Sequence, residues 1–362
     1  MKRVDCLLLF GVILISLFGL LMIYSSSYIW AEYKFNNQFK FFVTQGIFLV
    51  ISYFIMLIVI NIDYKRYLDK ANIIFGVCFL LLILVLIPGI GSVRNGSRSW
   101  FGFGGFGIQP SEFAKLGMII FTSKYLSNNE KELNKIFSGV FPILFILMII
   151  FGLIMLQPDF GTGIVLVMSI IVMLFISGVN MSFFVKVGVL GILGIVILVV
   201  IAPYRMERIL SFINPWSDPL GSGFQIIQSL YAIGPGGLLG MGLGNSIQKH
   251  FYLPEPQTDF IFSIISEEFG FLGILIVSSL FLLIIYRGFR ISKKCDDRFG
   301  KYLAFGITFQ LAFQSLLNLM VVVGLIPVTG VTLPFLSYGG SSLIITMLGT
   351  SILLNISKYN YE

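Results

Sequence analysis

Apolar runs of about 20 residues recur along the whole chain with short polar breaks between them, and this pattern constrains the fold more than any other feature. About 20 apolar residues is the length that a helix needs to cross the hydrocarbon core. Because lipid offers the backbone no hydrogen-bond partner, each run has to be helical. With 57% hydrophobic residues and a mean hydropathy of +0.96, the chain is an integral membrane protein. We predict ten transmembrane helices, over residues 6–27, 41–61, 71–90, 110–126, 137–156, 162–179, 183–203, 263–286, 303–325 and 339–356.

The Lys and Arg residues are distributed unevenly between the loops on the two sides of the predicted membrane. Of the 24, sixteen fall on one side and seven on the other, and Lys115 lies inside the fourth span. By the positive-inside rule the sixteen are cytoplasmic, which places both termini there. The net charge of +7 is therefore explained without a nucleic-acid partner. Three cysteines, two of them in predicted spans, indicate neither a disulfide framework nor a metal site.

The domain organisation is predicted to be a single membrane domain over residues 1–362. Its longest loop, residues 204–262, lies between the seventh and eighth spans on the extracytoplasmic side, and a second outer segment covers 91–109. The long loop contains an amphipathic helix lying on the membrane, with Ile226, Leu230 and Ile233 opposite Gln225, Gln228 and Ser229. The following GPGGLLGMGLGN lacks the Lys-Ser/Thr of a phosphate-binding loop, so we interpret its glycines as loop flexibility.

Charged and aromatic residues near the outer membrane surface are candidates for function. Arg98 and Trp100 suit a phosphate and a lipid or sugar face, or they anchor the chain at the interface. Glu112 and Lys115, spaced i,i+3, share one helix face and can form an ion pair that is either functional or architectural. Neither alternative is decided by the sequence alone.

The stretch YLPEPQTDFIF places Asp259 directly before the eighth span. A carboxylate there caps the helix, as Thr258 also could, or acts as a base that accepts a proton from a hydroxyl. Glu267 and Glu268 are further candidates, with helix packing as the alternative. We interpret Asp159 of QPDFGTG as a cap and the single histidine, His250, as an interfacial residue. The last loop, PVTGVTLPFLSYGGSS, is polar and kinked by two prolines, and its side chains could line a cavity.

Six segments taken together resemble the SEDS family (shape, elongation, division and sporulation), membrane glycosyltransferases that polymerise glycan strands from lipid II. The segments are SRSW with QPSEFAK, QPDFGTG, NPWSDPLGSGFQIIQSLYAIGPGG, LPEPQTDFIFSIISEEFGFLG and LPFLSYGGSS, in the family's order. The resemblance covers nearly the whole chain. Its wording is closer to the FtsW and SpoVE branch, for division and sporulation, than to the RodA branch.

The resemblance implies a fold of ten helices with an outward-facing cavity and a catalytic aspartate at Asp259. It assigns substrate binding to Arg98, Trp100, Glu112 and Lys115. A histidine commonly precedes the Thr-Asp pair in the family, whereas this chain has Gln257. The implied partners are a class B penicillin-binding protein, which is a transpeptidase, and other division or sporulation membrane proteins.

In the implied reaction, Asp259 takes the proton of the acceptor 4-hydroxyl as that oxygen attacks the donor C1 with inversion, and undecaprenyl diphosphate leaves. Arg98 and Lys115 are the candidates for the diphosphate charge. No cofactor is indicated, and a divalent cation on the diphosphate is an open alternative. Two other functions compete: a transporter that flips lipid II, and a non-catalytic scaffold for the transpeptidase.

Overall fold

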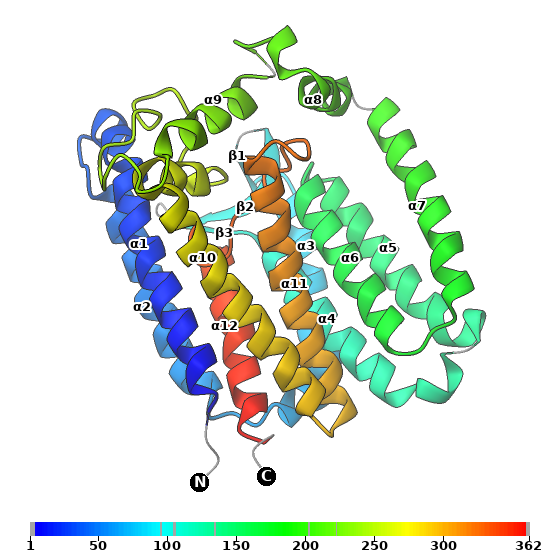
Figure 1. The fold of residues 1–362 in the computed structure, drawn as a ribbon. Helices are drawn as coiled ribbons and strands as arrows, with labels where there is room; N and C mark the ends of the chain where they lie inside the picture. Colours follow the sequence, from blue (N-terminus) through cyan, green and yellow to red (C-terminus); the bar gives the residue numbers. More distant parts are fainter. Residues whose placement is uncertain are drawn as a thin grey trace.

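The computed structural model describes residues 4–94, 96–103, 106–133, 135–201, 203–221 and 223–359. Most of this chain forms a bundle of long helices, with both chain ends at the same end of the bundle (Figure 1). The helices are α1 (Cys6–Phe35), α2 (Lys40–Val59), α3 (Lys65–Leu86), α4 (Pro110–Asn128), α5 (Phe141–Met155), α6 (Phe160–Ile176), α7 (Met181–Ile201), α8 (Pro203–Ile213), α9 (Phe224–Ile233), α10 (Ile261–Lys294), α11 (Arg298–Val322) and α12 (Gly340–Ser357). Short 3-10 turns cover Glu130–Glu132, Pro215–Ser217 and Gly234–Gly236, and a π-helical turn, Ile136–Val140, leads into α5.

A helix occupies each of the ten predicted spans. In the described chain, eight helical stretches are long and apolar enough to cross a membrane. The other two are α6, which is apolar but has only 17 residues, and α4, which carries Glu112, Lys115 and Lys124. Two helices extend well beyond the predicted spans, α1 to Phe35 and α10 to Lys294. The predictions ended where polar residues begin, although a helix continues into the polar interface without cost to its own hydrogen bonds.

Side-chain carboxylates begin several helices where the sequence places an acid. Asp5 caps α1 by accepting from Leu8 N at 3.0 Å, and Asp297 caps α11 by accepting from Gly300 N at 2.8 Å. Asp5 also forms a buried ion pair with Arg287 near the end of α10. These contacts fix the end of the bundle at which the chain starts and finishes, opposite the candidate site.

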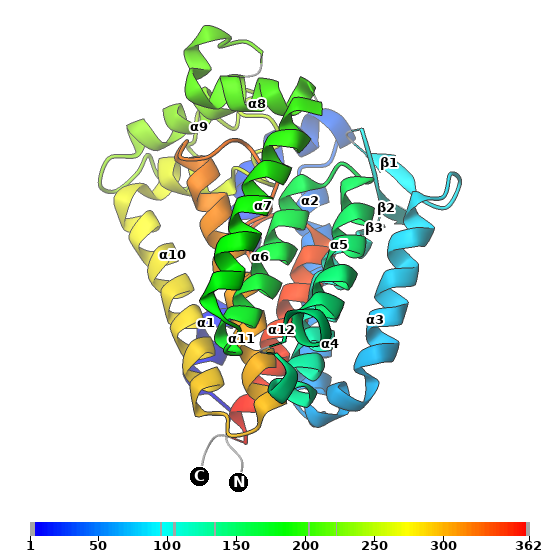
Figure 2. The ribbon, with the colours of Figure 1, turned by 90° about the vertical axis from the view of Figure 1, so that its right-hand side faces the viewer.

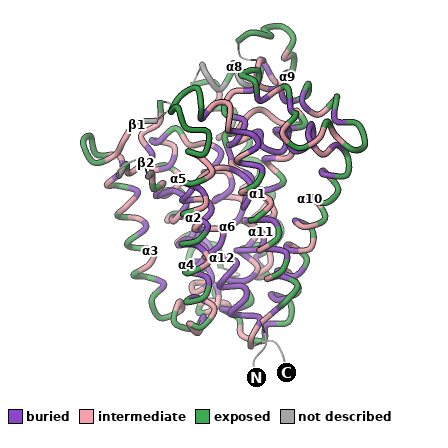
Figure 3. Tube along the Cα trace, turned by 90° about the vertical axis from the view of Figure 1, so that its left-hand side faces the viewer, coloured by how far each residue is buried: buried purple, intermediate pink, exposed green. Residues whose placement is uncertain are grey.

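The core of the bundle lies among α1, α4, α10, α11 and α12, whose facing side chains are buried (Figure 3). Around it, α2 and α3 expose large apolar side chains, as a lipid-facing surface does. Helix α7 stands at the edge of the bundle, and within its described residues none of its apolar window is buried (Figure 2).

The outer segment 91–109, expected to be a loop, folds into a small antiparallel sheet with strand order β1-β2-β3. The strands are β1 (Ser92–Arg94), β2 (Ser97–Phe103) and β3 (Phe106–Ile108). Trp100 pairs with Ser92 and Arg98 with Val93. The register shifts between Ser92 and Val93, so Ser99 is an extra residue on β2, and simple alternation does not place Arg98 and Trp100 on one face of the sheet.

The glycine-rich segment 236–242 packs against a break in α10, which is a correction to its interpretation as flexible. Gly270 has a φ of 60°, and the helix ladder is interrupted there. Met241 N and Gly242 N donate to the carbonyls of Glu267 and Glu268, while Phe271 N and Leu272 N donate to Gly237 O and Leu238 O. The loop thus satisfies the backbone groups that the break leaves open.

Glycine is required at this contact because the two backbones approach closely. A Cβ at Gly240 would lie 2.2 Å from Glu268 O, and one at Gly236 would lie 2.1 Å from Ser266 O. Both distances are shorter than any side chain tolerates, so the glycines permit close approach. The sequence showed that glycines were enriched here but not which backbone they contact.

The amphipathic pattern around residue 226 corresponds to α9, which packs on the protein. Ile226, Ile227 and Ala232 are buried on its inner face. Ser229, assigned from the sequence to the polar face, is fully buried and donates to Val322 O at 2.7 Å while bonding Ser263 Oγ at 2.8 Å. Leu230 is exposed instead. Relative to the predicted orientation, the helix is therefore rotated about its axis so that Ser229 faces α10 and α11. The spacing of apolar residues did not predict these hydrogen bonds.

Candidate functional site

The connection between α11 and α12, residues 323–339, organises the outer end of the bundle. It is irregular backbone that turns back among the helices. Within a membrane, irregular backbone is tolerated only where protein surrounds it or where it lines a cavity. Asp259 borders this segment directly, and Lys115 is linked to it through Gln314. The sequence indicated only that its polar side chains could line a cavity.

Asp259 lies in the turn before α10, with Phe260 at the N-cap position. The side chain is half-buried, and a Cβ built at Gly330 would lie 3.8 Å from its Oδ2 atom. Gly330 has a φ of 72°, a conformation that favours glycine. The carboxylate therefore borders the α11–α12 connection at a point where the connection has no side chain.

Three consecutive carbonyls fix the backbone of this turn. Gln257 O accepts from Tyr338 N at 2.8 Å, Thr258 O from Ser337 Oγ at 2.6 Å and Asp259 O from Asn318 Nδ2 at 2.8 Å. Asn318 also donates to Val331 O at 2.8 Å. The turn that carries Asp259 is thus attached to both α11 and the α11–α12 connection.

Glu112 and Lys115 form the predicted ion pair, with 2.8 Å between Glu112 Oε1 and Lys115 Nζ. Both side chains are buried, and Lys115 Nζ also donates to Gln314 Oε1 at 2.8 Å. Gln314 in turn donates to Thr332 O at 3.1 Å. The ammonium thus has two oxygen partners, which offset part of the cost of burying it inside the bundle.

One face of α11 joins this ion pair to the turn of Asp259. Gln314 and Asn318 are four residues apart, so their side chains lie one above the other on the helix. The sequence analysis missed both residues. The signal that could have found them is the spacing of Gln310, Gln314 and Asn318 at i, i+4 and i+8 in an otherwise apolar helix, which predicts a polar stripe facing protein.

Asp159 caps α6, as the sequence suggested, and has further partners. Its Oδ1 accepts from Thr162 N at 3.2 Å, and its Oδ2 accepts from Gln109 Nε2 at 2.8 Å and Ser111 Oγ at 3.2 Å. Burial raises the pKa of the Asp159 carboxyl, an effect opposed by its hydrogen bonds to Thr162. The residue ties the start of α4 to the start of α6, beside Glu112 and Lys115.

The small sheet that carries Arg98 and Trp100 is joined to this region through Ser97. Ser97 Oγ donates to Gln157 O, which fixes β2 against the turn before α6. The Nε atom of Arg98 is buried and has no hydrogen-bond partner in the described part of the chain, and neither has the buried amide group of Gln157. Unpartnered buried polar atoms are rare, and a ligand or water that completes them is a usual explanation.

The remaining acids hold structure together. Glu267 accepts from Ser246 Oγ at 2.5 Å and Ile247 N at 2.8 Å, and Glu268 pairs with Lys249 at 2.8 Å. Both carboxylates are buried, in agreement with the packing alternative. His250 is exposed.

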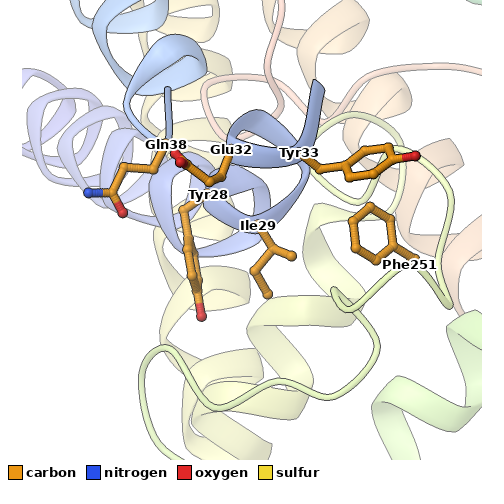
Figure 4. Close-up of a pocket in the computed structure, with 6 residues that line it drawn as sticks. All are labelled: Tyr28, Ile29, Glu32, Tyr33, Gln38 and Phe251. Atoms are coloured by element: carbon orange, nitrogen blue, oxygen red, sulfur yellow. The ribbon is translucent and has the colours of Figure 1, made fainter. Parts of the chain in front are cut away.

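Two cavities lie away from the predicted residues or only touch them. One of about 400 Å³ lies at the outer end of α1, where the rings of Tyr33 and Phe251 pack edge to face (Figure 4). The other, of about 20 Å³, has Gln310 and Gln314 in its wall and has room for one water. Within the described ranges, no three His, Cys, Asp or Glu side chains are grouped to hold a metal ion.

A helical membrane bundle with a carboxylate, a buried ion pair and an arginine gathered at one end defines a membrane-embedded enzyme fold of the SEDS type. The sequence profile of the FtsW, RodA and SpoVE proteins, described as "Cell cycle protein", matches residues 5–362. The chain belongs to this family, and the resemblance read from its motifs is confirmed. It is a multi-pass protein of the cytoplasmic membrane.

Known proteins resemble the chain over nearly its full length. Stage V sporulation protein E of Bacillus subtilis is 52% identical over 356 residues, covering 98% of this chain and 97% of that protein. A probable peptidoglycan glycosyltransferase FtsW of Geobacter sp. is 41% identical over 360 residues, covering 99% and 98%.

Solved structures agree in fold. A chain from a structure described as "Structural coordination of polymerization and crosslinking by a peptidoglycan synthase complex" matches with a TM-score of 0.82 and 31% identity over 99% of both chains. The rod shape determining protein RodA of Thermus thermophilus matches with a TM-score of 0.73 and 27% identity, covering 99% of this chain and 98% of that one.

Proposed function

We propose that this chain is a peptidoglycan glycosyltransferase that polymerises lipid II into β-1,4-linked glycan strands at the outer face of the cytoplasmic membrane. The observation that supports it most is the attachment of Asp259 and Lys115 to one face of α11, through Asn318 and Gln314. This arrangement holds the backbone of Asp259 and the ammonium of Lys115 on one helix, and catalysis by preorganised groups requires such fixed positions. The names of the relatives support the same activity.

In this proposal Asp259 is the general base. It accepts the proton of the acceptor 4-hydroxyl while that oxygen forms a bond to the donor C1, and the bond from C1 to the undecaprenyl diphosphate oxygen breaks. The electron pair leaves with the diphosphate, and the anomeric carbon is inverted, so the enzyme needs no covalent intermediate. The half-buried position of Asp259 leaves its carboxylate room to meet a hydroxyl.

The leaving diphosphate needs cations beside it. Arg98 is the better candidate, because its Nε donor is buried without a partner and an oxyanion would complete it. Lys115 is already bonded to Glu112 and Gln314, so its contribution is the field of a fixed charge. Trp100, on the same strand as Arg98, would pack against a sugar or the lipid. No cofactor is proposed, and a divalent cation would be an addition to these groups.

The proposed topology has ten crossings, both termini in the cytoplasm and residues 204–262 outside, within a single domain over 1–362. The placement of both chain ends at one end of the bundle supports an even number of crossings (Figure 1). The proposed partners are a class B penicillin-binding protein and other membrane proteins of division or sporulation. The relative from a peptidoglycan synthase complex supports a transpeptidase partner. No nucleic-acid partner is proposed.

The decisive experiment is polymerisation of purified lipid II by the purified protein with its transpeptidase, comparing wild type with Asp259→Asn and resolving strand lengths. We expect strands from wild type and none from the variant. Phe260 occupies the N-cap position of α10, with no side-chain cap bond. Asparagine keeps the size and the acceptor oxygen of aspartate but is no base, so loss of strands separates proton acceptance from a structural role. Strands from both proteins would remove Asp259 as the base, and strands from neither would contradict the polymerase and make lipid II transport the next assay.

A test of Arg98 separates binding from catalysis. Arg98→Ala should lower turnover much more than lipid II binding if the guanidinium acts on the developing diphosphate charge. Equal losses in turnover and affinity would contradict that role.

A further inference from the structure

A buried ion pair joins Lys249 to Glu268, the two ends of a chain segment that contains the turn of Asp259. Their Nζ and Oε1 atoms are 2.8 Å apart, and both side chains have no exposed surface. Lys249 lies ten residues before Asp259 and Glu268 nine residues after it, and the pair closes this part of the chain into a ring. We call Lys249–Glu268 the outer ion pair.

The two halves of the ring differ in stiffness. The half after Asp259 is the outer part of α10, which runs as helix from Ile261 to the break at Gly270. The half before it, residues 250–256, runs as an irregular arch in which Leu253 and Pro256 are buried and most of the other residues are exposed. Phe251 and Glu255 have positive φ angles of 66° and 46°. The arch has two prolines and forms no helix or strand. Leu253 N donates to Gln248 O at 2.9 Å and the Leu253 side chain packs in the core, so the arch is held at its ends and at Leu253.

The outer ion pair is also attached to α1. Ser25 Oγ lies 2.8 Å and 2.6 Å from the two carboxylate oxygens of Glu268, and it donates to that group. The ammonium of Lys249 lies 4.9 Å from the ring centroid of Tyr28, at a distance suited to a cation–π contact. The ion pair that closes segment 249–268 is thus held by α1, while Asn318 and Ser337 hold the turn of Asp259 in the middle of that segment.

We propose that Lys249, Glu268 and Ser25 are positioning residues for the reaction at Asp259. The outer ion pair fixes the distance between the two ends of the ring, and α1 fixes the pair, so the carboxylate of Asp259 stays where a hydroxyl can reach it. A displacement of about 1 Å at a reacting group can cost on the order of a hundredfold in rate. This inference rests on the proposed function, because it assigns Asp259 as the base.

A purely structural role is the competing explanation, and the chain supplies a matched control. Asp5 and Arg287 form a second buried ion pair, near the chain termini at the opposite end of the bundle. Removing a buried ion pair changes stability in either place, but only the outer ion pair should change catalysis. The test variants are Lys249→Met with Glu268→Gln, and the control variants are Arg287→Met with Asp5→Asn. Glutamine can still accept from Ser25, and asparagine can still cap α1, so each double variant removes the ion pair and keeps these hydrogen bonds. The outer variant also loses the contact of Lys249 with Tyr28.

Lipid II polymerisation is measured for each protein with its transpeptidase, together with the thermal melting temperature. We expect the outer double variant to lose about tenfold to a hundredfold in kcat, with KM changed by less than about threefold, while the control stays within about threefold of wild type. A loss of equal size in the control, or a loss that falls on KM alone, would overturn the inference.

A second variant covers the case in which the outer double variant does not fold. Ser25→Ala keeps both charges and removes only the contact to α1, and it should lower kcat by about fivefold, the equivalent of one hydrogen bond of about 1 kcal/mol. Unchanged kcat in a folded Ser25→Ala variant would reject positioning through α1, whether or not the double variant folds. The comparison of wild type with Asp259→Asn separates a failure of this inference from a failure of the proposed function. If wild type makes strands and Asp259→Asn makes none, the proposed function stands and only the positioning role is tested. If wild type makes no strands, the proposed function is rejected, and the inference with it.

Discussion

Two buried asparagines hold turns at opposite ends of the bundle, and their comparison shows what a single residue contributes. Asn318 donates to Asp259 O and Val331 O, while Asn355 donates to Ile60 O and accepts from Tyr64 N. Both are buried and both join a turn to a helix. Their energetic roles are similar, and only Asn318 contacts the residue proposed as the base.

Asn318→Ala should therefore separate positioning from stability. Asn318→Ala removes the side-chain donor of two carbonyls, and Asn355→Ala removes the acceptor of Tyr64 N, while Ile60 O keeps the bond from Lys358 Nζ. Each loss should cost about 1–3 kcal/mol in the free energy of unfolding. We expect Asn318→Ala to lower kcat about tenfold or more, and Asn355→Ala to lower stability by a similar amount with kcat nearly unchanged. Polymerisation kinetics and thermal unfolding of the two variants provide the measurement, and equal kcat in both would contradict the role given to Asn318.

Gly330 offers a second test at the residue scale. Its φ of 72° is strained for any other residue, and its missing Cβ faces Asp259 Oδ2. Gly330→Ala should cost about 1 kcal/mol of stability and also lower kcat. Gly324→Ala is the control, since Gly324 has a φ of 71° in the same connection but faces Ile226 and Leu230. If both variants keep full kcat at similar stability loss, the carboxylate does not use the space beside Gly330.

At the scale of elements, the docking of the glycine-rich segment 236–242 into the break of α10 accounts for a helix of 34 residues that bends without proline. The four exchanged backbone bonds make the loop part of the helix. A Cβ at Gly270 would lie 2.4 Å from Gly240 N, so the contact tolerates no side chain there.

Gly270→Ala should accordingly release the loop from α10. We expect faster amide hydrogen exchange at residues 237–242 and a lower melting temperature, because strain at positive φ adds to the steric clash. Gly152→Ala in α5 is the control: its Cβ meets open space, and alanine favours helix by about 1 kcal/mol over glycine. Unchanged exchange at the loop in Gly270→Ala would show that the docking does not depend on glycine.

The elements also show where sequence analysis succeeds and where it stops. The helices were predictable because a membrane requires every long apolar run to satisfy its own backbone. The pairing of Glu112 with Lys115 was predictable because i,i+3 spacing is a local property. The bonds of Asn318 to Asp259 and of Glu268 to Lys249 and Ser25 were not, because they join segments whose proximity is set by packing. The sheet at 92–108 was missed because strands of three to seven residues rich in glycine carry almost no periodicity.

At the scale of the whole molecule, the number of membrane crossings depends on α4 and α6. Helix α6 is shorter than the other spans, and α4 carries three charged residues. Most of α4 is buried against neighbouring helices, including the ion pair at its start. A helix enclosed by protein does not need an apolar surface, because its polar groups meet partners instead of lipid. We therefore expect both α4 and α6 to cross the membrane.

The position of Lys131 tests this expectation. With ten crossings the exposed turn after α4, which contains Lys131, lies in the cytoplasm; if neither α4 nor α6 crosses, the same turn lies outside. In a variant whose three native cysteines are replaced by serine, Lys131→Cys should react with a membrane-impermeant maleimide only after the cells are permeabilised. Tyr252→Cys, at an exposed position of the arch, should react in intact cells and serves as the control. Labelling of Lys131→Cys in intact cells would indicate eight crossings. It would also place the turn of Asp159 on the cytoplasmic side, which contradicts the hydrogen bond between Ser97 of the outer sheet and Gln157 of that turn.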